Sequence, residues 1–439
     1  MNQISTRPMP ECARRRKQLM RMVGEDAIVV LPAAPPRTRS NDTHYGYRQD
    51  SDFWYLSGFP EPEAVLVLVP GRAHGQALLF CRDRDPAREA WDGARAGTDG
   101  AVAGYGFDDA YPIADIDDIL PGLLEGRRRV FYHFGRDADF DLKMIGWVKR
   151  VRAQVKQGAQ APHEFLELGH FLHEMRLFKS REELRLMRRA AQIAAQAHVI
   201  AMRTARPGMH EYEIEAAIIH HFRRHDAQLA YESIVGSGAN ACTLHYVAND
   251  ALMADGDLLL IDAGAEYRNY ASDITRTFPV NGRFSKEQRA IYQLVLDAQT
   301  AALAQARPGI AYDAGHHAAV ATLSEGLLRL GLLKGTLDKV IADKAYERFY
   351  MHKTGHWLGL DVHDVGVYRE DGESTKLRPG MVLTVEPGLY ISPGSDAPKA
   401  LQGIGVRIED DILVTRGGYR NLSGGIPSDP DTLEDIVQG

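Results

Sequence analysis

The chain has 439 residues, of which 44% are hydrophobic and 25% charged, and it carries a formal net charge of −7 at pH 7. This composition is typical of a globular protein with a sizeable core, and the length exceeds that of one ordinary domain, so we expect two domains. The negative charge argues against a nucleic-acid partner, because nucleic-acid-binding proteins normally carry a basic face.

The N-terminal segment MNQISTRPMPECARRRKQLM lacks the apolar core of a signal peptide. No run in the chain reaches the roughly 18 apolar residues of a membrane span, so we expect no membrane association. The basic run Arg14–Lys17 is interpreted as the solvated face of a first helix that ends near Met22, with a binding patch as the alternative.

The three cysteines, Cys12, Cys81 and Cys242, are odd in number, far apart and in no CxxC pair. They favour neither a disulfide framework nor a thiolate metal site. A reducing compartment fits this usage, and we predict a cytoplasmic location.

Short apolar runs alternate with polar segments marked by glycine and proline between residues 27 and 153. The runs include AIVVLP, EAVLVLVP, QALLFC and RRVFYHFG. Strands interleaved with helices produce this pattern, so we predict an N-terminal α/β domain.

A polar stretch, KQGAQAPHE at residues 156–164, precedes a long helical pattern that begins at Ser180. Ser180 and Glu183 have the spacing of a capping box, and Pro207–Gly208 marks the stop. Helix-like and strand-like segments then follow in mixed order, which predicts an α+β second domain. The predicted domains are residues 1–175 and 176–439.

Two aspartates lie close together in the strand-like segments of the second domain. Asp262 ends the run DLLLID and Asp273 lies in ASDITRTFPV, with residues 267–269 as a plausible turn between them. In a hairpin the two carboxylates would face each other and repel, so a positive group is expected between them. The alternative is a surface hairpin with two solvated aspartates.

Two further strand-like segments carry carboxylates. Arg407 and Glu409 are two residues apart and therefore share one face of a strand, while Glu386 follows the apolar run MVLTV and precedes Pro387. The segment MHKTGHWLGLDVHD at residues 351–364 adds three histidines. Each feature alone is typical of a surface or core residue, but together they predict a metal cluster.

Carboxylate oxygens with imidazole and no thiolate favour hard to borderline cations. Mn²⁺ is the preferred candidate, with Zn²⁺, Co²⁺ or Fe²⁺ as alternatives. Four carboxylates exceed what a single catalytic zinc takes, so two divalent ions that share bridging carboxylates are predicted. Such a pair lowers the pKa of a shared water and polarises a carbonyl, which is the chemistry of hydrolysis.

Four segments in this order, DAGAEYRNYASDITRTFPVNG, HKTGHWLGLDVHD, TVEPGLY and GVRIED, resemble the pita-bread metallopeptidases of family M24, and within them the aminopeptidase P group. The stretch RQDSDFWYLSGFPEPEAVLVLV is similar to the N-terminal domain of that group, so the resemblance spans most of the chain. It implies an RNase H-like α/β N-terminal domain and an α+β pita-bread catalytic domain.

The resemblance also implies a set of metal ligands. It makes Asp262 a ligand of one ion, His356 and Glu386 ligands of the other, and Asp273 and Glu409 bridges between them. None of these five positions departs from the family pattern.

Further residues receive roles from the same resemblance. His245 and His363 lie beside the substrate as catalytic residues, and Glu386 or Glu409 accepts a proton. The substrate pocket is assigned to His352, Arg407, Tyr390 and Tyr231, each with a packing role as the alternative.

The implied activity is removal of the N-terminal residue from peptides whose second residue is proline, through attack by a metal-bridging hydroxide. A prolidase, which cleaves only Xaa-Pro dipeptides, is the nearest alternative. A metal-free pita-bread binding protein and a dinuclear phosphoesterase are more distant alternatives.

The resemblance further implies a homo-oligomer, a dimer or a tetramer, in which the N-terminal domain helps assembly and restricts access to the site. Trp91 matches a position that can approach the site of a neighbouring subunit. We favour packing of this tryptophan in the core.

Overall fold

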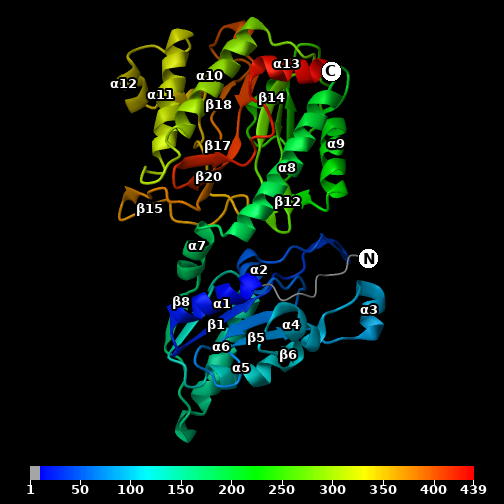
Figure 1. Ribbon diagram of the computed structural model, residues 1–439, viewed down its shortest axis with the longest axis vertical. Helices are drawn as coiled ribbons and strands as arrows, with labels where there is room; N and C mark the ends of the chain where they lie inside the picture. The colour runs from blue at the N-terminus through cyan, green and yellow to red at the C-terminus, as the bar shows by residue number, and fades with distance from the viewer. Residues whose placement is uncertain (1–9) are drawn as a thin grey trace. The chain divides into compact units, whose positions relative to one another are not determined.

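The computed structural model describes residues 10–439, and the chain divides into two compact units at the bond between Met175 and Arg176 (Figure 1). Helix α7, Gly169–Leu177, contains this division. None of the helices within residues 10–439 is both long and apolar enough to span a membrane.

The first unit is built on a mixed six-stranded sheet with the order β6-β5-β4-β1-β7-β8. Strand β1 pairs parallel to β7 and antiparallel to β4, and β2 with β3 forms a separate short hairpin. The strands are β1 Ala27–Pro32, β2 Thr38–Ser40, β3 Thr43–His44, β4 Val65–Leu68, β5 Ala77–Cys81, β6 Asp109–Pro112, β7 Arg129–Tyr132 and β8 Glu164–Glu167.

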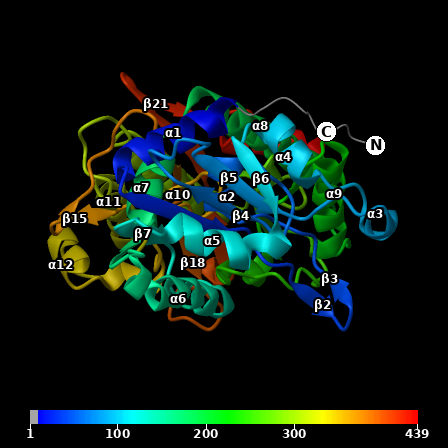
Figure 2. The same cartoon turned by 90° about the horizontal axis from the view of Figure 1, so that it is seen from below.

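Helices cover this sheet because its four central strands, β5, β4, β1 and β7, are apolar on both faces. Alternate residues such as Ile28 and Val30 of β1 pack with Leu120 of α5 and Trp147 of α6, and the two helices lie side by side (Figures 1 and 2). The helices of the unit before α7 are α1 Pro10–Val23, α2 Ser51–Ser57, α3 Pro86–Asp92, α4 Gly97–Tyr105, α5 Ile116–Leu124 and α6 Ala138–Ala153, with 3₁₀ turns η1 Ile113–Asp115 and η2 Val155–Gln157.

The basic run of α1 differs from the sequence prediction. Arg14 and Lys17 are exposed, but Arg15 and Arg16 are buried, with exposed fractions of 4% and 1%. Arg16 donates hydrogen bonds to the carbonyl oxygens of Leu56 and Tyr105. The interpretation of this run as a solvated face is therefore wrong for its two central residues, which bind distant helix ends.

Trp91 also differs from the prediction. It lies on α3, a helix without buried residues, and 88% of its surface is exposed. The expectation that Trp91 packs in the core is wrong.

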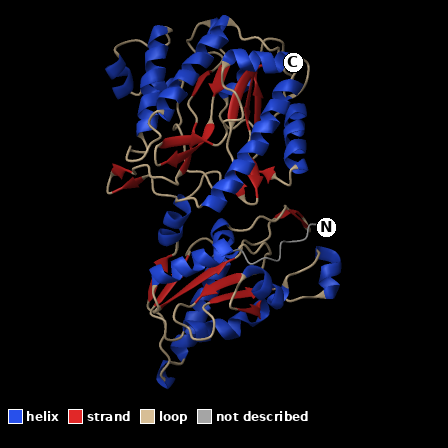
Figure 3. Ribbon diagram, viewed as in Figure 1, coloured by secondary structure: helices blue, strands red, loops and turns tan. Residues whose placement is uncertain are grey.

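The second unit has a single large hydrophobic core between several small antiparallel sheets and their helices. Figure 3 shows most strands of this unit between α8 and α9 on one side and α10 and α11 on the other. The helices are α8 Arg181–Thr204, α9 Glu211–Arg224, α10 Lys286–Leu303, α11 Ala314–Arg329, α12 Leu337–Ala342 and α13 Pro430–Gln438, with 3₁₀ turns η3 Gly238–Cys242, η4 Ala345–Arg348 and η5 Lys399–Leu401.

The predicted start of α8 is confirmed. The Ser180 side chain accepts a hydrogen bond from the Glu183 amide, and the Glu183 carboxylate accepts one from the Ser180 amide. Two donors that a helix start leaves unpaired are thereby satisfied. The helix ends at Thr204, shortly before Pro207.

The strands of the second unit form the sheets β10-β11-β14, β13-β12-β9, β17-β20-β21, β18-β19 and β15-β16. In the first of these, Asp262 at the end of β11 pairs in register with Thr275 at the start of β14. The strands are β9 Gln228–Leu229, β10 Ile234–Ser237, β11 Leu258–Asp262, β12 Ala265–Tyr267, β13 Tyr270–Ala271, β14 Thr275–Pro279, β15 Arg369–Glu370, β16 Glu373–Ser374, β17 Val382–Val385, β18 Gly388–Ile391, β19 Ile404–Arg407, β20 Asp410–Thr415 and β21 Gly418–Asn421.

Candidate active site

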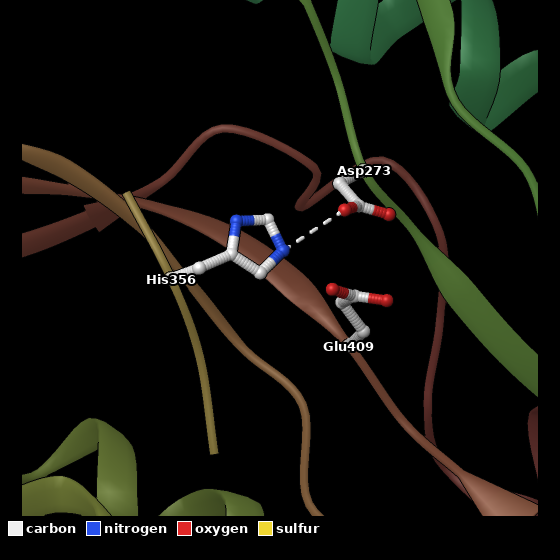
Figure 4. Close-up of side chains that lie close together, drawn as sticks. All are labelled: Asp273, His356 and Glu409. Atoms are coloured by element: carbon white, nitrogen blue, oxygen red, sulfur yellow. Dashed lines mark ion pairs between the residues drawn. The ribbon is translucent and has the colours of Figure 1, made fainter. Parts of the chain in front are cut away.

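Three predicted metal ligands, Asp273, His356 and Glu409, converge in the second unit (Figure 4). Each offers one ligand atom, and these atoms lie within 4.8 Å of one another. Asp273 precedes β14, Glu409 lies between β19 and β20, and His356 lies in the segment before β15. The chain therefore brings together groups that are up to 136 positions apart in sequence.

The orientation of His356 suits a metal ligand. Its Nδ1 lies 2.9 Å from the carbonyl oxygen of Trp357, which accepts a hydrogen bond from that nitrogen. Its Nε2 faces carboxylate oxygens of Asp273 at 3.2 Å and Glu386 at 3.6 Å. Burial lowers the pKa of His356, but the hydrogen bond and charge of Asp273 outweigh it and raise the pKa to about 9. The carboxylates thus attract positive charge to the Nε2 position, where a metal would bind.

Close packing of two backbone segments positions His356 and Glu386. A Cβ atom on Gly355 would lie 2.0 Å from the carbonyl oxygen of Thr384, so only glycine fits there. The Thr384 hydroxyl oxygen accepts a hydrogen bond from the His356 amide at 3.0 Å, and the hydroxyl donates to Glu386 at 3.2 Å. Burial raises the pKa of Glu386 to about 7.

Asp262 and Asp273 meet at the hydroxyl of Tyr231. The Tyr231 oxygen lies 2.6 Å from Asp262 Oδ1 and 2.5 Å from Asp273 Oδ1, although one hydroxyl has a single proton to donate. Asp262 Oδ2 accepts a hydrogen bond from Arg407 Nη2 at 2.6 Å. A positive group, Arg407, therefore lies beside Asp262, while the group between the two aspartates is the Tyr231 hydroxyl. Asp273 is buried, so the alternative of a solvated surface hairpin is wrong.

Thr275 contacts Glu409 and Arg407 through its hydroxyl group. Its hydroxyl donates to Glu409 Oε2 at 2.6 Å, and its oxygen accepts a hydrogen bond from Arg407 Nε at 3.2 Å. Thr275 is a site residue that was not predicted from the sequence. Its place two residues after Asp273, on the same face of an extended chain, was the available signal.

A chain of hydrogen bonds links Arg407 to His352. Arg407 Nη1 donates to the Tyr390 oxygen at 3.0 Å, and the Tyr390 oxygen lies 2.8 Å from His352 Nε2. Burial lowers the pKa of His352 to about 4, so this ring is neutral, and its Nδ1 donates to the carbonyl oxygen of Lys353 at 2.7 Å. His352 Nε2 is therefore the acceptor for the Tyr390 hydroxyl.

The two predicted catalytic histidines are exposed. The His363 ring stands edge-on to the His356 ring, with centroids 4.4 Å apart. The next residue, Asp364, is buried and accepts hydrogen bonds from Lys179 at 3.0 Å and from Arg176. This buried ion-pair group fixes the backbone next to His363.

These residues surround a cavity of about 800 Å³. Ten of the eleven predicted site residues line it, namely Tyr231, His245, Asp262, Asp273, His352, His356, His363, Glu386, Arg407 and Glu409. Tyr390 is not part of the wall, since it is 1% exposed and lies behind His352 and Arg407.

Carboxylate groups and one imidazole at the floor of a cavity, with no thiolate, suit divalent metal ions of hard to borderline character. Burial raises the pKa values of Asp262 and Glu409 as well as that of Glu386. The cluster therefore fits a bound cation, which would compensate these buried negative charges.

Comparisons with known proteins agree with this geometry. The model of metallopeptidase family M24 matches residues 185–416, and that of the aminopeptidase P N-terminal domain matches residues 12–132. The Xaa-Pro aminopeptidase of Escherichia coli K12 is 46% identical over 439 residues, covering 100% of the chain and 99% of that protein. Human Xaa-Pro aminopeptidase 3 is 36% identical, covering 97% of the chain and 85% of that protein.

Solved structures are similar over nearly the whole chain. The structure of Pseudomonas aeruginosa aminopeptidase PepP is 55% identical with a TM-score of 0.97, covering 98% of both chains. A variant of Escherichia coli aminopeptidase P in complex with substrate is 46% identical with a TM-score of 0.96, again covering 98% of both chains.

The chain therefore belongs to metallopeptidase family M24. Within that family it is an enzyme of the Xaa-Pro aminopeptidase group, a hydrolase with that group's N-terminal domain and the pita-bread catalytic domain. The predicted resemblance and fold class are confirmed.

Proposed function

We propose that this enzyme removes the N-terminal residue from peptides with proline in the second position, using two divalent metal ions. The observation that carries the proposal is the orientation of His356, whose Nε2 faces two carboxylates at 3.2 and 3.6 Å while its Nδ1 is held by a carbonyl oxygen. An imidazole held in this way presents Nε2 to the cluster, and it becomes a metal ligand when an ion takes the place of the Nε2 proton.

Asp262 would hold one ion, and His356 with Glu386 would hold the other, while Asp273 and Glu409 bridge them. Five ligand residues, four of them carboxylates, support two ions better than one, and this ligand set favours Mn²⁺. When bound, the ions would supply an activated water and polarise the scissile carbonyl.

The side chains around the cluster supply the remaining steps. Glu386 or Glu409 accepts the proton of the attacking water at a carboxylate oxygen. His363, beside His356 on the cavity wall, donates a hydrogen bond to the oxygen of the scissile carbonyl, and His245 binds the peptide or passes a proton to the leaving nitrogen.

Proline selectivity has a physical basis in the same cavity. The Xaa-Pro amide has no N–H group, so the wall facing its nitrogen needs no acceptor there. His352 and Arg407 line the cavity and contact the same buried tyrosine, Tyr390, which holds both in place for the proline ring and the following carbonyl. Tyr231, the remaining pocket residue, also lines the cavity, and its hydroxyl contacts both aspartates.

The first unit would help assembly into a homo-oligomer, a dimer or a tetramer, and restrict access to the site. The exposure of Trp91, 88%, supports a role for α3 in contacts with a second copy of the chain. The three free cysteines suit a reducing cytoplasm.

Hydrolysis assays test the proposed function. Metal-stripped protein is assayed with the tripeptide Ala-Pro-Ala and the dipeptide Ala-Pro, before and after addition of Mn²⁺, with Asp273→Asn as the matched variant. We expect manganese-dependent release of alanine, faster from the tripeptide and lost in the variant.

Cleavage of the dipeptide alone would instead identify a prolidase. A protein that cleaves neither peptide with any divalent metal would contradict the proposal and favour the metal-free binding protein.

A further inference from the structure

Most charged residues that line the catalytic cavity have a partner of opposite charge or a hydrogen-bond donor. Asp262 pairs with Arg407 at 2.6 Å, and Asp313 pairs with Arg369 at 3.2 Å. His356 faces Asp273 and Glu386, and Glu409 accepts from Thr275. Among the described residues of the wall this leaves Glu232 and Lys353, whose charged groups form no hydrogen bond or ion pair with residues 10–439.

Lys353 is close to the reaction centre. It directly follows His352, whose Nδ1 lies 2.7 Å from the Lys353 carbonyl oxygen and 3.8 Å from Glu386 Oε2. The Lys353 side chain is exposed and lines the cavity, so its ammonium group can reach a ligand there.

The wall around Lys353 offers further polar groups but no free acid. His316 and His317 of α11 line the same cavity, and His316 Nδ1 lies 2.9 Å from the Thr354 hydroxyl. Burial and then the charge of Lys353 lower the pKa of His316 to about 4, so this ring is neutral. The two acids whose charges act on His316 are paired, since Asp313 pairs with Arg369 and Glu347 lies 3.5 Å from Lys344.

The other unpaired group, Glu232, follows Tyr231, the residue that holds Asp262. The unpaired carboxylate of Glu232 therefore lies beside Asp262, and the unpaired ammonium group of Lys353 lies beside His352. A peptide has a positive N-terminus and a negative C-terminus, so these two charges favour one direction of binding, with the C-terminus toward Lys353.

We propose that Lys353 forms a carboxylate subsite, which receives the free C-terminus of a short peptide. The Xaa-Pro bond of that peptide lies at the acid cluster, which consists of Asp262, Asp273, Glu386 and Glu409 together with His356. Two extended residues after the scissile bond span about 7 Å, which suits a tripeptide. The inference rests on the proposed function and adds a substrate class to it. An acidic side chain at the same position offers the same chemistry as a C-terminus.

Kinetics with matched peptides test this subsite. The Mn²⁺-loaded enzyme is assayed with Ala-Pro-Ala, its C-terminal amide, and Ala-Pro-Asp amide. We expect KM for the free acid to be up to about fivefold lower than for the Ala-Pro-Ala amide, the range of a solvent-accessible ion pair. In Lys353→Gln the ratio of KM for the amide to KM for the free acid should be close to one, and in Lys353→Arg it should return to the wild-type value. Lys334 is an exposed lysine outside the cavity, so Lys334→Gln should keep the wild-type ratio.

The aspartyl amide distinguishes the two carboxylate sources. A KM as low as that of the free acid means that the subsite accepts a side-chain carboxylate, and a KM like that of the Ala-Pro-Ala amide means that it accepts a C-terminus alone. A ratio that Lys353→Gln leaves unchanged would overturn the proposal.

Measuring the affinity for uncleaved ligands tests the Lys353 subsite independently of the proposed peptidase activity. Calorimetry compares Pro-Ala with Pro-Ala amide on the wild-type protein and on Lys353→Gln. If the wild-type enzyme cleaves none of the peptides, the proposed activity is wrong, while a preference for the free acid that depends on Lys353 still supports the subsite. Equal binding of both ligands would contradict it.

Discussion

Arg407 and Asp262 form a buried ion pair in which Nη2 lies 2.6 Å from Oδ2. Asp262 is also a proposed metal ligand, so in the metal-free protein Arg407 compensates its charge. Arg407→Met should destabilise the metal-free protein by about 3 kcal/mol, because it leaves a buried carboxylate unpaired. A bound cation would replace the lost charge, so adding Mn²⁺ should raise the free energy of unfolding more in this variant than in the wild type.

Urea unfolding with and without Mn²⁺ measures both effects. Arg276→Met is the matched control, since Arg276 is equally buried but pairs with Asp410 at 2.8 Å, which is not a proposed ligand. A gain from Mn²⁺ no larger in Arg407→Met than in the control would count against a cation at Asp262.

The Thr275 hydroxyl orients Glu409 through a 2.6 Å hydrogen bond. Thr275→Val keeps the shape of the side chain but removes this donor. Loss of a group that orients a ligand typically weakens metal binding about tenfold or more, and we expect that loss here. Calorimetric titration with Mn²⁺ measures it. Thr300→Val, which removes a hydroxyl that donates to a backbone carbonyl on α10, should leave the affinity unchanged.

Asp364 is a positioning residue for His363. Its carboxylate binds Lys179 at 3.0 Å and Arg176, and all three side chains are buried. Asp364→Asn leaves Lys179 without its counter-charge and Arg176 with Asp361 alone, so we expect a loss of about 3 kcal/mol in stability and a fall in kcat. Asp361→Asn is the control, because Asp361 is 36% exposed and binds the Arg176 end of the group. If the two substitutions lowered stability and kcat equally, Asp364 would not be a positioning residue for His363.

His133 predicts a pH dependence of the first unit. It is buried with Asp52, whose Oδ2 lies 3.1 Å from His133 Nε2, and it also contacts Glu167, while Arg136 and His173 face the same Asp52 oxygen. Burial lowers the pKa of His133, but its interactions with Asp52 outweigh this and raise the pKa above its usual 6.5. A raised pKa stabilises the folded state below about pH 6.5, and this stabilisation is lost as the pH rises through the folded-state pKa.

His133→Gln should therefore lower the free energy of unfolding more at pH 5.5 than at pH 9. Denaturant unfolding at both pH values measures the difference, with the exposed His74→Gln as control. A loss that does not depend on pH would mean that His133 acts through packing alone.

Local signals in the sequence predicted much of the fold. The capping-box spacing of Ser180 and Glu183 located the start of α8, and apolar runs located β1, β4, β5 and β7. The run before Glu386 forms β17, and the two-residue spacing of Arg407 and Glu409 predicted a shared direction. In the structure the strand is interrupted between them, yet both side chains reach the Thr275 hydroxyl.

Residues whose role depends on distant partners were not predictable in this way. Arg15 and Arg16 are buried because they bind carbonyl oxygens at Tyr55 and Leu56, 40 residues away. Tyr231 reaches Asp262 and Asp273 only after three segments have folded together. Composition and periodicity carry no information on such contacts.

If Asp262, Asp273, His356, Glu386 and Glu409 hold two divalent ions, as we propose, the number of ions bound per chain will show it. Metal-stripped wild-type protein and Asp273→Asn are titrated with Mn²⁺ by calorimetry, and bound metal is counted after dialysis. We expect two ions per wild-type chain and at most one in the variant, since Asp273 is proposed to bridge both. A single ion in the wild type, or two ions retained in Asp273→Asn, would rule out the proposed two-ion site.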